Sequence, residues 1–117
     1  MRFPLGIKTT SLKLLIALIG VLASVSSFAC RDLTQFYDEV ERDPRAVIEQ
    51  LGAILTDCYD SSEYFALLGA AYLGEGDLLR ALESLERALL LEPGNGSAAV
   101  DFAEVLYRQG QVLNAVE

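Results

Sequence analysis

The clearest hydrophobic pattern in this 117-residue chain is a pair of apolar stripes between residues 65 and 93. The first stripe advances by three and then four residues, at Phe65, Leu68 and Tyr72. The second advances by four and then three, at Ala81, Leu85 and Ala88. Residues at such steps share one face of an α-helix. Gly76 can end the first helix because glycine tolerates positive φ, and Asp77 can cap the second. The pattern predicts two antiparallel helices joined by a short turn.

A weaker helical hairpin is expected before this pair. Apolar residues at helical spacing run from about Arg31 to Arg42 and from Pro44 to Asp57. Asp43 followed by Pro44 is a favourable combination of N-cap and first-turn residue. We therefore expect two further helices, in a hairpin less regular than the one after it.

A shift of 34 residues tests whether the stronger hairpin repeats. The residue 34 positions after Tyr72 is Leu106, and the residue 34 positions after Gly76 is Gly110. A second copy is therefore expected over residues 96–117, ending early in its second helix.

This second copy is expected to be incomplete. Ser97 is expected to cap its first helix. In its second helix, Val112 and Ala115 would face a partner that the sequence lacks. We expect either the rest of a longer protein or another subunit to complete that face, because helical repeats bury their apolar surface against neighbours.

The stronger hairpin resembles the tetratricopeptide repeat. Its signature residue types occur in the expected order at Phe65, Leu68, Gly69, Tyr72, Ala81, Leu85, Ala88 and Pro93. Phe65 stands where the family prefers tryptophan. The resemblance implies an all-α fold of antiparallel helix-hairpin repeats, a tetratricopeptide-like α-solenoid, and we expect a signal peptide at residues 1–29 before it. The expected units are a degenerate hairpin at 30–61, a repeat at 62–95 and a partial, truncated repeat at 96–117.

The resemblance also implies where a partner would bind. In this family, ligands lie in a concave groove lined by the first helix of each repeat. The corresponding positions here are Glu63, Ala66, Ala70, Leu73, Val100, Glu104 and Tyr107. This lining is apolar to acidic and lacks the basic and amide residues with which some family members capture a carboxylate, apart from Arg108 nearby. The expected partner is another protein, bound through an apolar or basic segment.

Residues 1–29 have the layout of a secretory signal peptide. Arg2, Lys8 and Lys13 precede an apolar run of about a dozen residues, and Ser27-Phe28-Ala29 resembles a cleavage site. We therefore expect export to a bacterial periplasm. The run is short for a bilayer span, although an uncleaved N-terminal anchor stays open as an alternative.

Cys30 and Cys58 are expected to form a disulfide. They stand at the start and the end of the first predicted hairpin, which antiparallel packing brings together, and an exported protein meets oxidising conditions. The alternative is lipidation of Cys30, because Ala29-Cys30 resembles the end of a lipoprotein signal. Membrane attachment is expected only through that lipid or an uncleaved signal.

Charge and residue types narrow the function. Residues 30–117 contain six arginines, no lysine and all 17 acidic residues, which gives a formal charge of −11. This argues against nucleic-acid binding. The chain has no histidine, and its two cysteines are 28 positions apart, so we expect no catalytic residue, no metal site and no cofactor.

The sequence thus favours a non-catalytic interaction scaffold of the bacterial cell envelope, in assembly or export machinery. The alternative is an N-terminal helical extension of a larger exported or outer-membrane protein, without a partner of its own. An enzyme is expected only if a further C-terminal part carries the catalytic residues.

Overall fold

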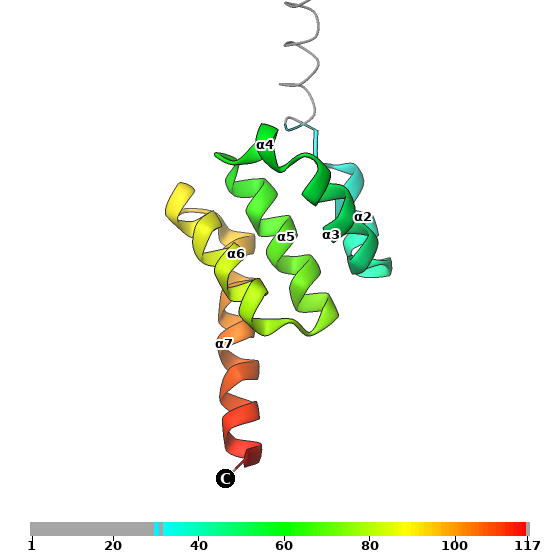
Figure 1. Cartoon of the computed structure of the whole chain (residues 1–117). Helices are drawn as coiled ribbons and strands as arrows, with labels where there is room; N and C mark the ends of the chain where they lie inside the picture. The colour runs from blue at the N-terminus through cyan, green and yellow to red at the C-terminus, as the bar shows by residue number, and fades with distance from the viewer. Residues whose placement is uncertain (1–29, 31, 117) are drawn as a thin grey trace, which may run out of the picture.

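The computed structural model describes Cys30 and residues 32–116, and the predicted signal peptide at 1–29 lies outside the described residues. The described part is helical, without a strand, which confirms the predicted all-α hairpin fold (Figure 1). In chain order the helices are α2 (Gln35–Arg42), α3 (Pro44–Ala53), α4 (Leu55–Cys58), α5 (Ser62–Glu75), α6 (Leu78–Leu91) and α7 (Gly96–Val116).

The centre of the fold is α5, which packs against α2 and α3 on one side and against α6 and α7 on the other (Figure 1). Its sequence, SEYFALLGAAYLGE, is apolar nearly all the way round rather than along a single stripe. A helix of that kind must be covered on several sides. Seven of its 14 residues are buried, whereas the expected stripe residues Phe65, Leu68 and Tyr72 are only half-buried.

The hairpin before α5 follows the expected pattern with one break. Asp43 caps α3, since its carboxylate accepts the backbone N–H of Ala46 at 3.1 Å. The second helix was expected to run to Asp57, but α3 ends at Ala53 and the short α4 follows. The break lies at Ile54, whose φ of −113° and ψ of 11° leave the helical region.

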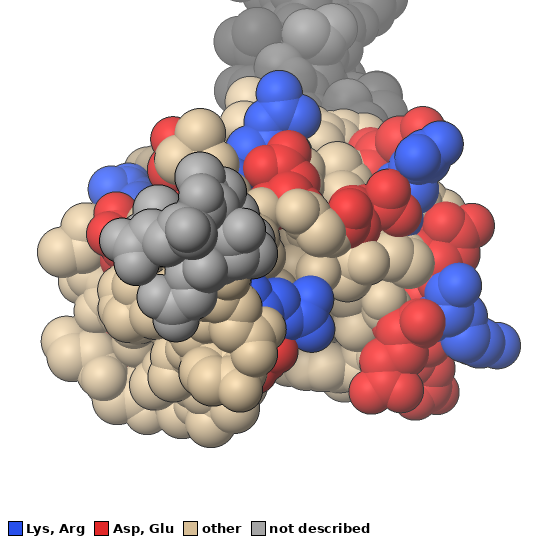
Figure 2. All heavy atoms as spheres, turned by 90° about the horizontal axis from the view of Figure 1, so that it is seen from below, with Lys and Arg blue, Asp and Glu red and all other residues tan. Residues whose placement is uncertain are grey.

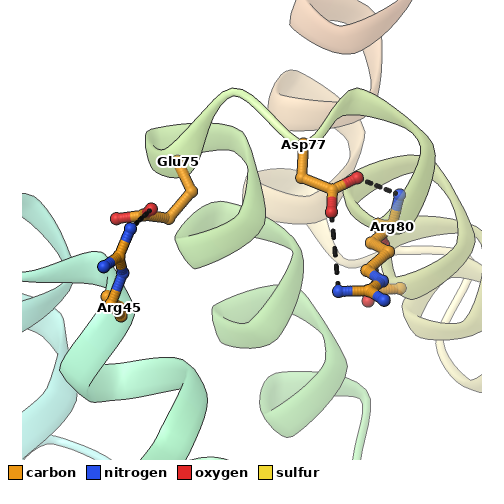
Figure 3. Close-up of polar contacts among 5 residues, drawn as sticks. Arg45, Glu75, Asp77 and Arg80 are labelled. Carbon is orange, nitrogen blue, oxygen red and sulfur yellow. Dashed lines mark hydrogen bonds and ion pairs between the residues drawn. The ribbon is translucent and has the colours of Figure 1, made fainter.

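The turn between α5 and α6 forms as the sequence predicts. Gly76 takes a φ of 77°, and the Asp77 side chain accepts the backbone N–H of Arg80 at 3.1 Å (Figure 3). The Arg80 guanidinium lies 3.7 Å from the same carboxylate. Beside this turn, Arg45 of α3 pairs with Glu75 of α5 at 3.4 Å (Figure 3). Both ion pairs are exposed and contribute little to stability.

The α5 and α6 axes approach closely at Gly69. A Cβ atom at that position would lie 2.5 Å from Cγ of the buried Leu85, so α6 occupies the space that a side chain would need. This explains the small residue that the repeat signature places there, because real Cβ atoms do not tolerate such a distance.

The last helix differs from the expected partial repeat. The sequence predicts a turn at Gly110, but α7 runs without interruption from Gly96 to Val116, and its lower part projects beyond the other helices (Figure 1). Gly76 is followed by the capping residue Asp77, whereas Gly110 is followed by Gln111, which does not favour an N-cap. The predicted partner face of Val112 and Ala115 lies outside the described side chains.

Candidate functional site

Within the described residues, a groove of about 1110 Å³ opens along α5. The floor is formed by α5, one wall by α2 with the start of α3, and the other wall by α7 and the turn before it. The floor residues are Glu63, Ala66, Leu67, Ala70, Leu73 and Gly74. The first wall contributes Tyr37, Val40, Glu41 and Pro44. The second contributes Glu92, Gly94, Asn95, Gly96, Ser97, Asp101 and Arg108.

The structure brings together the predicted groove residues of α5 but not those of α7. Glu63, Ala66, Ala70 and Leu73 all line the groove. The α7 residues Val100, Glu104 and Tyr107 do not; Val100 is 69% exposed and Tyr107 is 64% exposed.

Packing of α7 explains this difference. Ala98 and Val105 are completely buried against the α5–α6 pair, and this fixes the rotation of α7 about its own axis. Asp101 and Arg108 then turn toward the groove. These two residues stand 34 positions after Leu67 and Gly74, which also line it, so the repeat of 34 holds for a neighbouring set of positions.

The charged groups along the groove are mostly acidic. Glu41, Glu63, Glu92 and Asp101 line it together with one arginine, Arg108. Burial, and to a lesser extent the charge of Glu104, raise the pKa of Asp101 above its usual value. The Arg108 guanidinium is held by Glu104, with Nε 2.7 Å from Oε1. The groove therefore has a negative potential over an apolar floor.

A hydrogen bond joins the α2 wall to the α5 floor. The Tyr37 hydroxyl donates to Oε1 of Glu63. This bond, then partial burial and the charge of Glu63, raise the pKa of Tyr37 to about 12. Because Tyr37 and Glu63 lie 26 positions apart, no local pattern could have predicted their pairing.

Asn95 fixes the opposite wall, and sequence reasoning missed its role. Its Oδ1 accepts the backbone N–H of Ala98 at 3.1 Å, so Asn95 caps α7 and the predicted cap, Ser97, does not. Its Nδ2 donates to Oγ of Ser62 at 2.9 Å, and the buried Ser62 hydroxyl donates to the Ala88 carbonyl at 2.8 Å. This chain of bonds ties the turn before α7 to the first residue of α5. The signal available in the sequence was Asn95 itself, a favoured N-cap type after Pro-Gly.

The repeat-signature residues mainly build the hairpin. Gly69, Ala81, Leu85 and Ala88 are buried at the α5–α6 contact, and Pro93 is exposed in the turn that follows. The half-buried Phe65 and Tyr72 rings are each covered by an arginine of α6. Arg87 lies 5.7 Å from the Phe65 ring centre, and Arg80 lies 5.9 Å from that of Tyr72. These are cation–π distances.

The two cysteines lie at the top of the N-terminal hairpin. The structure joins Cys30 to Cys58 in a disulfide, with their Cα atoms 5.3 Å apart. Cys58 is completely buried, in a cluster with Leu33, Phe36 and Tyr64 among others. The bridge thus closes the N-terminal hairpin.

In Cys30 and residues 32–116, no group of three or more His, Cys, Asp or Glu side chains is arranged to hold a metal ion. No helix within the same residues combines the length and apolarity that a membrane crossing needs.

Comparison with known proteins agrees with the helical geometry. Residues 72–116, from the end of α5 through α6 and α7, match the family model described as tetratricopeptide repeat. Neither the curated proteins nor the solved structures give a match. Tetratricopeptide repeats are generally non-catalytic scaffolds that bind other proteins. Residues 72–116 thus resemble a tetratricopeptide repeat, which confirms the recognition made from the sequence.

Proposed function

We propose that this protein is a non-catalytic scaffold that binds a segment of another protein in the groove along α5. The observation that carries the proposal is the groove itself, whose floor carries Ala66, Ala70 and Leu73 between two helical walls. Concave surfaces of this kind are the usual sites of ligand binding.

The walls of the groove are held in place before any ligand binds. The Tyr37–Glu63 bond fixes α2 on one side, and the Asn95–Ser62–Ala88 chain fixes the start of α7 on the other. A preformed site loses less conformational entropy on binding than one that must be ordered. An extended or helical segment can therefore dock without rearranging the helices.

The proposed place of action is the bacterial cell envelope, after export to the periplasm. The support is the signal-like sequence of residues 1–29 and the pairing of Cys30 with Cys58, because disulfides persist in oxidising compartments. A role in envelope assembly or export is consistent with a scaffold in that place.

Selection from a random peptide library displayed on phage tests the binding function. The bait is the chain as recovered from exporting cells, with its disulfide intact. We expect peptides that bind the natural chain and fail to bind Ala70→Trp, since Ala70 is half-buried on the groove floor and an indole there would fill the channel.

The matched control is Leu90→Trp, which puts the same side chain at a site on α6 that is 78% exposed and outside the groove. Circular dichroism would establish that both variants fold. Peptides that bind the natural chain and Ala70→Trp equally well would contradict the groove as the binding site, as would a selection that yields no binder.

A further inference from the structure

The charged side chains that line the groove are mostly acidic, and their individual contacts show which of them are paired. Four carboxylates line it, at Glu41, Glu63, Glu92 and Asp101, against the single guanidinium of Arg108. Within residues 32–116 the ion pairs are Arg45–Glu75, Arg80–Asp77 and Arg108–Glu104. The one groove arginine is therefore neutralised by a neighbour, while none of the four groove carboxylates takes part in these ion pairs.

Glu63 and Asp101 are the half-buried carboxylates of the groove, whereas Glu41 and Glu92 are exposed. Glu63 is itself a floor residue, and the Tyr37 hydroxyl uses only its Oε1 atom. A carboxylate has two oxygens and about four acceptor positions, so Glu63 can accept further donors. Asp101 projects from the α7 wall, and its partial burial disfavours the ionised form unless a cation is beside it.

The floor between these carboxylates suits apolar side chains of a partner. Ala66, Ala70 and Leu73 present only methyl and isobutyl groups to the groove. A partner that matches both features alternates cationic with apolar side chains. Figure 2 shows acidic groups on the α2–α3 side of the molecule, with arginines among them.

We infer that the groove takes a cationic protein segment, whose lysine or arginine side chains pair with Glu63 and Asp101 while its apolar side chains lie on Ala66 and Ala70. This inference rests on the proposed function and adds the chemistry of the partner. Charge complementarity of this kind determines which partners bind and speeds their encounter.

The test uses three short fluorescent peptides with identical apolar residues and with lysine, glutamine or glutamate at the alternate positions. Fluorescence anisotropy measures their binding to the full chain. We expect the lysine peptide to bind about tenfold more tightly than the glutamine peptide, and the glutamate peptide to bind least. Raising the salt concentration from about 0.05 M to about 0.5 M should remove most of that preference, because salt screens exposed charges.

Paired variants then locate the charges that matter. In the double variant Glu63→Gln with Asp101→Asn, both groups lose their charge but keep an acceptor oxygen, so the bond from Tyr37 is retained. We expect it to weaken binding of the lysine peptide about tenfold and to leave the glutamine peptide unchanged. The matched control is Glu83→Gln with Glu86→Gln, which removes the same net charge from exposed positions of α6 and should change binding less than about twofold.

Three outcomes would overturn the inference. Equal binding of the lysine and glutamine peptides would reject a cationic partner, and the groove function would still stand if Ala70→Trp removed that binding. Equal loss in the groove double variant and in the α6 control would mean that lysine is attracted by the overall negative charge rather than by this groove. A third outcome is that none of the three peptides binds, while the library yields peptides that need the groove and lack basic residues. It would reject a cationic partner and leave the proposed scaffold function standing.

Discussion

Two hydrophobic cores lie on different faces of α5 and are built from different kinds of side chain. The N-terminal core uses large residues and a covalent bond: Leu33, Phe36, Val47, Leu51, Cys58, Tyr64, Leu67 and Ala71. The C-terminal core is rich in alanine: Ala66, Leu73, Ala81, Leu85, Ala88, Ala98 and Val105. The first core fills a space between helices, and the second lets helices approach closely.

This difference explains why only the hairpin of α5 and α6 shows a recognisable repeat signature in its sequence. Close approach of α5 and α6 requires small residues at fixed steps, such as Gly69 opposite Leu85. These residues form a periodic pattern that can be recognised in the sequence. The N-terminal hairpin depends on particular contacts instead. The buried Tyr64 hydroxyl donates to the Leu51 carbonyl at 2.7 Å, and the disulfide closes the end. Large apolar residues can satisfy such a core in many arrangements.

The largest effect is expected in the close-packed core. Leu85→Ala should lower the free energy of unfolding by about 2–5 kcal/mol, because the side chain is completely buried and α5 cannot collapse further onto α6. The control is Leu90→Ala on the same helix, at 78% exposure, which should change it by less than about 0.5 kcal/mol. Urea unfolding followed by circular dichroism measures both, and similar losses would contradict the assignment of this core.

The covalent bond in the other core should come next. Reducing the Cys30–Cys58 bridge is expected to lower the free energy of unfolding by about 2–4 kcal/mol, because the unfolded chain regains the freedom of a loop of 28 residues. Unfolding in the presence and absence of a reductant measures this loss. The double variant Cys30→Ala with Cys58→Ala should show no response to reductant. A natural chain equally stable in both conditions would speak against the bridge.

Two glycines provide a smaller and more selective test. Gly69→Ala should destabilise by about 1–3 kcal/mol, since the new methyl group would overlap Leu85. Gly52→Ala in α3 should instead stabilise by about 0.4–1 kcal/mol, since a Cβ atom there meets nothing within 4 Å and alanine favours the helix. The opposite signs of the two changes in stability separate close packing from helix propensity. Thermal melting curves of the two variants measure both changes, and changes of equal sign would contradict the account.

The smallest effect concerns two tyrosines, the buried Tyr64 and the exposed Tyr37. Burial raises the pKa of Tyr64, whereas the bond to Glu63 raises the pKa of Tyr37 from 10.0 to about 12. A pKa raised by folding favours the protonated form, so the stability from Tyr37 is complete below about pH 10 and is lost as pH rises through about 12. Ultraviolet titration of the natural chain, with Tyr37→Phe subtracted, should give this value. Glu63→Ala, which removes the acceptor, should lower it toward 10.0, and an unchanged value would contradict the bond.

Much of the fold could be predicted from the sequence, because its signals are local. Asp43 and Asp77 cap the helices that they precede, and Gly76 takes the positive φ that ends α5. Each cap, and the end of α5, depends only on residues within about one helical turn. Steps of three and four residues, with these caps, therefore sufficed to predict the hairpin of α5 and α6.

The α7 wall could not be predicted because it depends on packing over long distances. The rotation of α7 follows from the burial of Ala98 and Val105, which turns Asp101 toward the groove and leaves Val100 outside it. The Tyr37–Glu63 and Asn95–Ser62 bonds join residues 26 and 33 positions apart. Of the predicted groove positions, those on α5 line the groove because α5 forms its floor.

The most direct test of the groove as a binding surface is amide chemical-shift mapping of the natural chain with a library-selected peptide. The account predicts that the largest shifts cluster at the floor and at the α7 wall, around Ala66, Ala70 and Asp101, and that exposed positions of α6 such as Leu79 and Leu90 stay unchanged. Shifts concentrated on the exposed face of α6, with an unperturbed floor, would contradict it and place the binding surface on the other side of the repeat.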